Sequence, residues 1–188
     1  MGTRKSESAN RLGQLTRRQA IVASAAALGG FGLMPATAWG RPQDEISHAA
    51  ESIHQEPEFK GGTKRIYTAL TDPKQFDKIV ELSGVLQAMH LGNIPSQISS
   101  SVGGPFALFG GFITGRQIEL VPDKRIVQAW RAEDWPEGIY SIARFELVPQ
   151  GGETKIVFDH TGFPKGDADS LASGWKAHYW EPLAKLLA

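Results

Sequence analysis

The chain has 188 residues and no cysteine. This absence excludes disulfide bonds, catalysis by a thiol nucleophile and lipid attachment at a cysteine. The sequence also lacks the G-x-S-x-G nucleophile elbow, the H-E-x-x-H metal motif and the Walker phosphate-binding loop. The glycine-rich stretch GGPFALFGG (103–111) has no Lys-Ser/Thr pair after it and indicates hairpin turns. No catalytic class is therefore indicated by a motif.

The chain has no excess of either charge, with 20 basic and 20 acidic side chains. Five of the basic residues and one acid lie in residues 1–38, which leaves 15 basic and 19 acidic side chains, a formal charge of −4. A mildly acidic body offers no electrostatic attraction to a phosphate backbone. We therefore expect no nucleic-acid partner.

The apolar stretch near the start of the chain is too short to span a membrane well. It runs for 15 residues from Ala20 to Met34 and is mostly Ala and Gly, whereas a bilayer needs roughly 20 apolar residues. It follows the twin arginines Arg17 and Arg18 and precedes the small-residue pattern Ala36-Thr37-Ala38. This order is typical of a secretory leader, and the paired arginines favour the twin-arginine route. An amphipathic or uncleaved anchor helix is the alternative.

These signals divide the chain into three parts. We expect a twin-arginine signal peptide at 1–38, a linker at 39–50 and one folded domain at 51–188. The protein would then be periplasmic or secreted, with no stable membrane anchor after the leader is cleaved. A domain of this length can bury a core without disulfide bonds.

The folded domain is expected to begin with a strand and two short helices. The strand covers 51–59, and the helices cover 62–72 and 73–82. Asp72 caps the second helix, and Pro73 lies in its first turn. The apolar residues repeat at helical spacing in both helices: Ile66, Ala69 and Leu70, then Phe76, Ile79 and Val80.

The segment 83–101 has no clear periodicity. It is long for a loop in a compact domain, and such loops are often lids or binding loops. A packing segment without regular structure is the alternative.

From residue 102 the chain changes to short segments rich in β-branched and aromatic residues. Short links such as Pro122-Asp123 and Gln150-Gly151-Gly152 join them, which predicts an antiparallel meander. Alternation then predicts the buried face of the sheet: Ile118, Leu120, Phe145, Leu147, Ile156, Phe158 and His160.

The last segment predicts a long helix that covers this face. Asp167 or Asp169 can cap it, and Pro182 should kink it because proline donates no backbone hydrogen bond. At 100° per residue its inner stripe is predicted as follows: Leu171, Trp175, His178, Tyr179, Pro182 and Leu186. A bent helix across a curved sheet rarely fills the space beneath it with side chains alone.

Four stretches resemble a known family in order and spacing. They are GGPFALFGGFITGRQIELVPDKRIVQAWR, DWPEG, FDHTGFP and GWKAHYWEPLAKLL, all between residues 103 and 188. They resemble the homologues of the heat-shock-protein-90 ATPase activator, in the START-like (SRPBCC) superfamily. The resemblance implies an α+β helix-grip fold, an antiparallel meander wrapped around a long C-terminal helix, with two short helices after the first strand. It also implies a cavity; it does not imply chaperone activation, because that chaperone is cytosolic and the leader predicts export.

The candidate ligand-binding residues are aromatic and apolar side chains of the inner face. Ordinary core packing is the alternative for each of them. Trp and Tyr suit a cavity wall because each offers apolar area and one polar group. The candidates are Phe112, Ile118, Trp130, Phe145, Phe158, His160, Trp175 and Tyr179.

His160 is the single candidate for catalysis. Asp159 and His160 are adjacent in a strand and point to opposite faces, so they cannot easily act on one atom. His160 and His178 could converge, but two histidines without a third ligand make a poor metal site. We expect no metal and no cofactor. His160 is therefore either a hydrogen-bonded core histidine or a general base in a cavity.

Three functions remain open at this point. The first is an exported module that binds an apolar or amphipathic small molecule in an internal cavity. The second is an enzyme of the cyclase, dehydratase or isomerase type that uses the same cavity. The third is a co-chaperone-like module that binds a protein partner.

Overall fold

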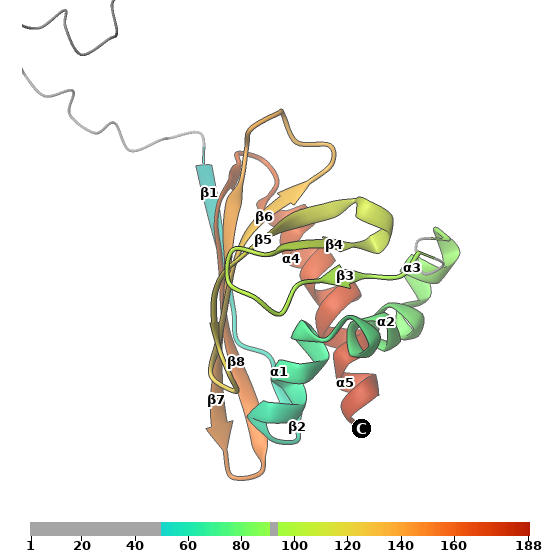
Figure 1. Cartoon of the computed structure of the whole chain (residues 1–188), viewed down its shortest axis with the longest axis vertical. Helices are drawn as coiled ribbons and strands as arrows, with labels where there is room; N and C mark the ends of the chain where they lie inside the picture. Colours follow the sequence, from blue (N-terminus) through green and yellow to red (C-terminus); the bar gives the residue numbers. More distant parts are fainter. Residues whose placement is uncertain (1–49, 91–93) are drawn as a thin grey trace, which may run out of the picture. The chain divides into compact units, whose positions relative to one another are not determined.

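The described part of the chain folds as an antiparallel sheet with helices packed on one face (Figure 1). The computed structural model describes residues 50–90 and 94–188, and the predicted leader lies outside these residues. The strand order is β1-β8-β7-β6-β5-β4-β3, and β2 also pairs with β8. The long C-terminal helix lies against this sheet, so the predicted α+β helix-grip fold is confirmed.

The antiparallel meander predicted from residue 102 onward is present, with the predicted links at Pro122-Asp123 and Gln150-Gly151-Gly152 between strands. Its strands are β4 Pro105–Leu108, β5 Ile113–Val121, β6 Arg125–Ala132, β7 Ser141–Gln150 and β8 Glu153–Pro164. The predicted first strand is two strands, β1 (Ala50–Gln55) and β2 (Glu58–Lys60), which both pair with β8. Pro57 lies between them and has no N–H for the ladder. Its carbonyl still accepts a hydrogen bond from the backbone N–H of Ile156, at 2.9 Å.

Three helices connect the first strands to the meander. They are α1 (Thr63–Thr71), α2 (Pro73–Leu82) and α3 (Gly84–Ala88). The Asp72 carboxylate accepts a hydrogen bond from the backbone N–H of Gln75 at 2.9 Å, which confirms the predicted cap of α2. The unassigned segment 83–101 therefore begins with α3, and it also contains the two-residue strand β3 (Gln97–Ile98).

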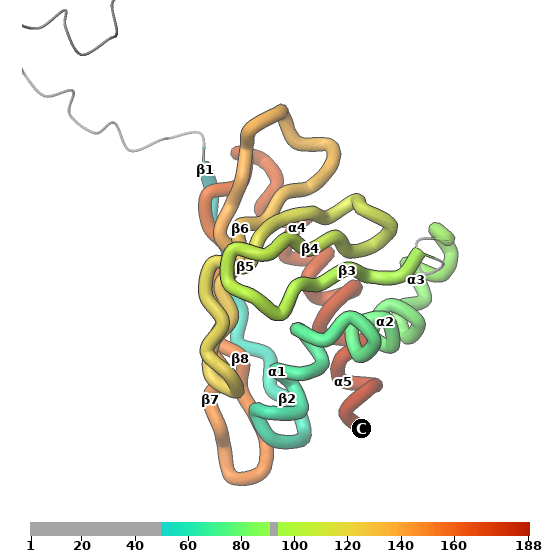
Figure 2. Tube along the Cα trace, in the orientation of Figure 1, coloured from blue at the N-terminus to red at the C-terminus, as the bar shows by residue number. Residues whose placement is uncertain are grey.

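The C-terminal helix consists of three consecutive pieces. They are α4 (Ala168–Trp175), the π-helical turn η3 (Lys176–Trp180) and α5 (Glu181–Leu187), which follow one another along the chain in Figure 2. The π turn ends two residues before Pro182, and the N–H of Glu181 bonds to the carbonyl of Lys176. No helix among the described residues is long and apolar enough to cross a membrane.

The π turn changes which side chains of the helix are buried. A π turn holds one residue more than an α turn, so the residues after it are rotated about the axis. The predicted stripe holds as far as Pro182, which is buried, and Leu186 is partly buried at its edge. The sequence analysis missed three buried residues of the second half: Trp180, Leu183 and Leu187.

The predicted alternation is wrong at Ile118. A β-bulge interrupts the pairing of β5 with β6, since Gln117 lies opposite Gln128 and Glu119 lies opposite Val127. The extra residue reverses the alternation, so Ile118 is 49 % exposed and Gln117 is fully buried. The Gln117 carboxamide accepts a hydrogen bond from Gln128 Nε2 at 3.3 Å. Ile118 therefore does not lie on the inner face of the sheet.

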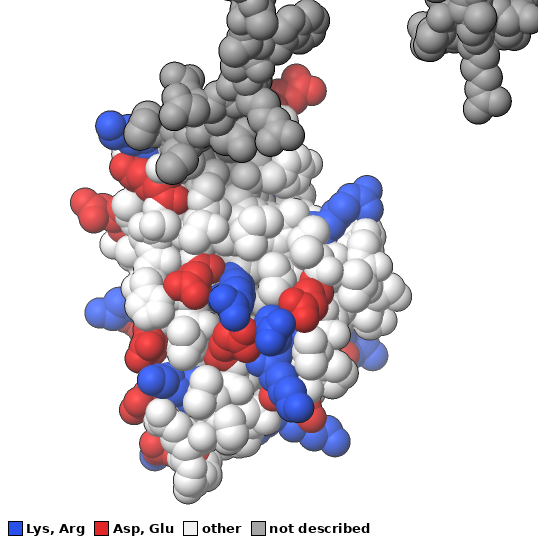
Figure 3. Space-filling view, turned by 90° about the vertical axis from the view of Figure 1, so that its left-hand side faces the viewer, with Lys and Arg blue, Asp and Glu red and all other residues white. Residues whose placement is uncertain are grey.

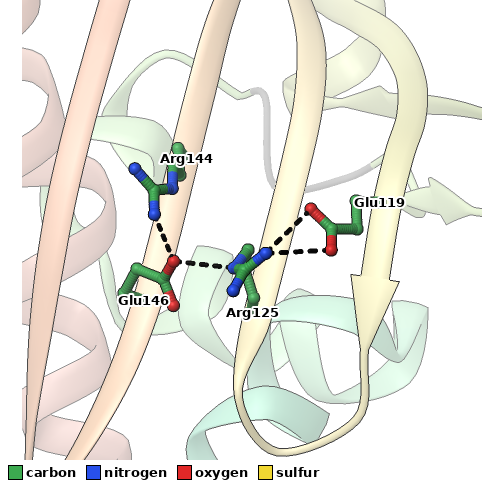
Figure 4. Close-up of polar contacts among 4 residues, drawn as sticks. All are labelled: Glu119, Arg125, Arg144 and Glu146. Carbon is green, nitrogen blue, oxygen red and sulfur yellow. Dashed lines mark hydrogen bonds and ion pairs between the residues drawn. The ribbon is translucent and has the colours of Figure 1, made fainter.

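The outer face of the sheet carries interleaved acidic and basic side chains (Figure 3). Arg125 links two neighbouring strands, with Nε 2.6 Å from Glu146 Oε1 and an Nη 3.0 Å from Glu119 Oε1. Arg144 also contacts Glu146 (Figure 4). This charged face borders water, whereas the helices cover the opposite face (Figure 1).

Candidate ligand cavity

A cavity of about 410 Å³ lies between three parts of the fold. These are α3, the turn η2 (Phe109–Gly111) and the first half of the C-terminal helix. Its wall is mainly apolar, and its volume lies in the range of small-molecule sites, roughly 300–1,000 Å³. The side chains that define its shape include Leu86, Met89, Phe109, Phe112, Leu171 and Tyr179.

The structure separates the eight predicted ligand-binding residues into three groups. Those that line the cavity are Phe112, Trp130, Trp175 and Tyr179. Those that are buried in the core but do not line it are Phe145, Phe158 and His160. Ile118 lies on the outer face, because of the bulge in β5.

His160 lies in a buried hydrogen-bond chain in which both ring nitrogens have partners. The indole Nε1–H of Trp175 lies 3.0 Å from Nδ1, and the Ser141 hydroxyl lies 2.6 Å from Nε2. An indole can only donate, so Nδ1 accepts and the ring proton resides on Nε2. The ring then donates to Ser141, whose hydroxyl donates to the carbonyl of Trp130 at 3.1 Å.

This environment keeps His160 neutral. Burial lowers the pKa of His160 to about 3, and His160 is not one of the residues that line the cavity. The placement is that of a hydrogen-bonded core histidine and gives a general base no contact with a bound molecule. Within residues 50–90 and 94–188 no group of three or more His, Asp or Glu side chains could hold a metal ion.

Three polar atoms in the cavity-lining residues are buried without a hydrogen-bond partner among the described residues. They are Trp130 Nε1, His178 Nδ1 and Tyr179 Oη. Burial raises the pKa of the Tyr179 phenol far above its ordinary value, although the Trp130 indole opposes part of this shift. Burial also lowers the pKa of His178. The phenol is therefore protonated and the imidazole uncharged at neutral pH.

Several cavity residues were missed by the sequence analysis. Phe109 is buried at a backbone φ of 53° in the turn after β4, and Leu86 and Met89 come from α3 and its end. The available signal was the length of the segment 83–101, which indicated either a lid or a packing segment. Its first part forms one wall of the cavity.

Comparison with known proteins assigns the family. The family model described as "Activator of Hsp90 ATPase homolog 1-like protein" matches residues 62–188. The chain belongs to this family. The match covers α1, α2, the meander and the C-terminal helix, and it confirms the predicted resemblance.

Members of the activator family with curated names are longer than this chain. The human "Activator of 90 kDa heat shock protein ATPase homolog 1" is 29% identical over 114 residues, which is 61% of this chain and 33% of the relative. The "Hsp90 co-chaperone AHA1" of Saccharomyces cerevisiae is 23% identical over 147 residues, 77% of this chain and 40% of the relative. The matched region thus spans about a third of the human protein.

Solved structures show the same fold. An HSP90 activator from Plasmodium falciparum superposes with a TM-score of 0.62 at 24% identity, covering 72% of this chain and 95% of that one. CalU16 from Micromonospora echinospora superposes with a TM-score of 0.59 at 20% identity, covering 74% and 77%. The activator-family fold is therefore shared at low sequence identity.

Proposed function

We propose that this chain is an exported member of the activator family that binds an apolar or amphipathic small molecule beside its C-terminal helix. The observation that carries the proposal is the cavity of about 410 Å³, which α3, η2 and the C-terminal helix leave between them with a mainly apolar wall. At the ~30 Å³ that a water molecule occupies in the liquid, this volume admits roughly a dozen heavy atoms. Burial of apolar ligand surface contributes about 25 cal/mol per Å², less the cost of immobilisation.

Exposed apolar side chains around the cavity support a route of entry. Val85, Met89 and Phe112 line the cavity and are 49 %, 58 % and 40 % exposed. Two of them, Val85 and Met89, come from the five-residue helix α3 and its end. An apolar molecule can thus contact the rim before it enters.

A pair of tryptophan variants tests whether ligands use this cavity. Ala177 lines it, whereas Lys176 is exposed on the same turn and does not. Apolar and amphipathic molecules of roughly a dozen heavy atoms that raise the melting temperature of the wild type should do the same for Lys176→Trp and fail with Ala177→Trp. Equal shifts in the two variants would place binding elsewhere, and no shift in the wild type would remove the proposal.

Export is the second part of the proposal, and its support is the order of twin arginines, apolar stretch and small-residue site. Arg17→Lys with Arg18→Lys keeps the charge and removes the arginine pair. In a bacterium with the twin-arginine route, fractionation should find the wild type outside the cytoplasm and the double variant inside. Equal distribution of the two would contradict this route.

A protein partner is a second candidate, because curated relatives carry the names of Hsp90 activators and co-chaperones. The exposed apolar residues Val85, Met89 and Ile94 offer a contact surface near α3. Native mass spectrometry of the protein from its own source distinguishes the two candidates. A retained small molecule supports the cavity function, and a retained polypeptide supports the second candidate.

A further inference from the structure

We propose that the cavity selects uncharged ligands that carry a carbonyl oxygen, which accepts hydrogen bonds from the Trp130 indole N–H and the Tyr179 hydroxyl. This inference rests on the proposed function, since it specifies the ligand class of the same cavity. The hydrocarbon part of the ligand would contact the apolar wall, and the carbonyl group would lie at the junction of β6 and η3.

The unpaired donors are the first argument. Trp130 Nε1 and Tyr179 Oη are buried, and neither has a partner at hydrogen-bond geometry within the described part of the chain. Burial raises the pKa of the phenol, but the two groups lie close enough for the indole to lower it in part, which places both donors at one point of the wall. Buried polar groups in proteins are nearly always hydrogen-bonded, so two such atoms in one cavity wall call for an explanation. The two side chains share a neighbour, since the Trp175 ring lies 5.8 Å from that of Trp130 and 4.1 Å from that of Tyr179.

The chemistry of these donors selects an acceptor. An indole N–H can only donate. The Tyr179 phenol keeps its proton because burial raises its pKa, so it can donate as well. A carbonyl oxygen has two lone pairs and can accept from both groups at once. His178 Nδ1 is the third unpaired atom of the wall and remains available to a second polar group of the ligand.

The absence of charge in the wall excludes ions. None of the described side chains that line the cavity is Asp, Glu, Lys or Arg, and burial keeps His178 neutral by lowering its pKa. A carboxylate, phosphate or ammonium group would enter without a counter-charge, and burying an unpaired charge is strongly unfavourable. An uncharged ketone, ester or aldehyde meets no such penalty.

The two donors are also covered by neighbouring side chains, so the carbonyl group reaches them only after small side-chain movements. The Cβ that Gly174 lacks would lie 3.8 Å from His178 Cδ2, so the glycine leaves space beside this ring. The ring of His178 lies 6.3 Å from Phe109 at a tilted angle. The His178 ring is therefore a part of the wall that has room to move.

The test compares four probes of similar size. Butyrophenone carries the carbonyl group, butylbenzene lacks it, and phenylbutyrate and phenylbutylamine carry opposite charges. Dissociation constants are measured for the wild type and for Trp130→Phe/Tyr179→Phe. Two hydrogen bonds of ordinary net strength predict that the variant loses about tenfold or more in its affinity for butyrophenone relative to butylbenzene.

A matched control carries the same two chemical changes outside the cavity. Trp180→Phe/Tyr140→Phe alters one buried indole that bonds Gln55 and one exposed phenol, and neither residue lines the cavity. Its ratio of ketone to hydrocarbon affinity should stay within about twofold of the wild type. If the Trp130→Phe/Tyr179→Phe protein does not melt cooperatively, Tyr179→Phe alone replaces it, with about a threefold effect expected for one bond.

The outcomes distinguish failure of the carbonyl site from failure of the proposed cavity function. If no probe binds the wild type, the cavity function and the inference fail together. If both uncharged probes bind and the ratio is the same in wild type and variant, the cavity function stands and the carbonyl site is wrong. Binding of phenylbutyrate or phenylbutylamine as tight as that of butyrophenone would also overturn the selection of uncharged ligands.

Discussion

Two neighbouring parts of the interface between helix and sheet use the same residue types in opposite ways. In the packed part, His160 has partners on both ring nitrogens and the Phe158 ring lies 4.4 Å from that of Trp175. In the cavity part, Trp130 Nε1 and Tyr179 Oη have no partner among the described residues. The two parts share the same aromatic residue types and differ in whether their buried polar atoms are paired.

We expect the greatest loss of stability from a substitution in the packed part. Phe158→Ala should lower the free energy of unfolding by about 3–5 kcal/mol, because Phe158 is fully buried and its removal leaves a hole. Leu171→Ala, in the half-buried wall of the cavity, should cost only about 1 kcal/mol. Urea denaturation measures both changes, and similar losses would mean that the two parts are packed alike.

Acid should destabilise the packed part through His160. Its pKa is lowered to about 3 in the folded protein from an ordinary value of 6.5, so the unfolded chain binds more protons between these values. The free energy of unfolding is therefore unaffected by protonation of His160 above pH 6.5. It falls as the pH drops from 6.5 towards 3, with a slope of up to about 1.4 kcal/mol per pH unit. His160→Gln should flatten this slope in urea denaturation across the pH range. An unchanged slope would assign the acid sensitivity to other groups.

The same substitution, tryptophan to phenylalanine, can be made in each of the two parts and its cost in stability compared. Trp175→Phe removes the donor to His160 and leaves Nδ1 unpaired, which should cost about 1–3 kcal/mol. Trp130→Phe removes an N–H without a partner in the described residues, so little beyond lost packing should follow, about 1 kcal/mol or less. Equal costs in thermal or urea unfolding would show that the Trp130 indole is bonded in solution.

The smallest effect is expected on the outer face, which serves as a reference for both parts. Arg125→Met removes contacts to Glu119 and Glu146, but Arg125 is 38% exposed in its side chain. Exposed ion pairs contribute about 0.2–1 kcal/mol each and weaken in salt. Unfolding in low and high salt should show a small loss that salt reduces further. A loss as large as that of Phe158→Ala would contradict this ranking.

Local signals in the sequence predict much of the fold. The Asp72 cap, the stripe of α1 and the inward position of Phe158 depend on neighbours within a few residues, so spacing alone predicts them. The bulge at Ile118 was not predictable in this way, because it arises from the pairing of β5 with β6. The burial of Leu183 depends on the π turn, which regular periodicity cannot represent.

The candidate site was less predictable than the fold. The sequence identified the aromatic wall through Phe112, Trp130, Trp175 and Tyr179, of which the last three lie on elements with clear periodicity and Phe112 lies directly before β5. It did not identify Phe109, which lies in a turn, or the wall formed by α3, since both depend on contacts between segments far apart in the chain. The unpaired state of Trp130 Nε1 is likewise a property of its surroundings in space.

The π turn at Lys176–Trp180 has a consequence for how this domain can vary. The turn places two adjacent aromatic residues in different surroundings. Tyr179 lines the cavity, whereas the ring of Trp180 lies 5.2 Å from the ring of Phe158 in the core. Deleting one residue there would restore regular α-helix and rotate everything from Glu181 onward by about 100°. Under the proposed function, ligand contacts from this helix would therefore come only from residues up to Tyr179, whereas Trp180 and α5 pack in the core.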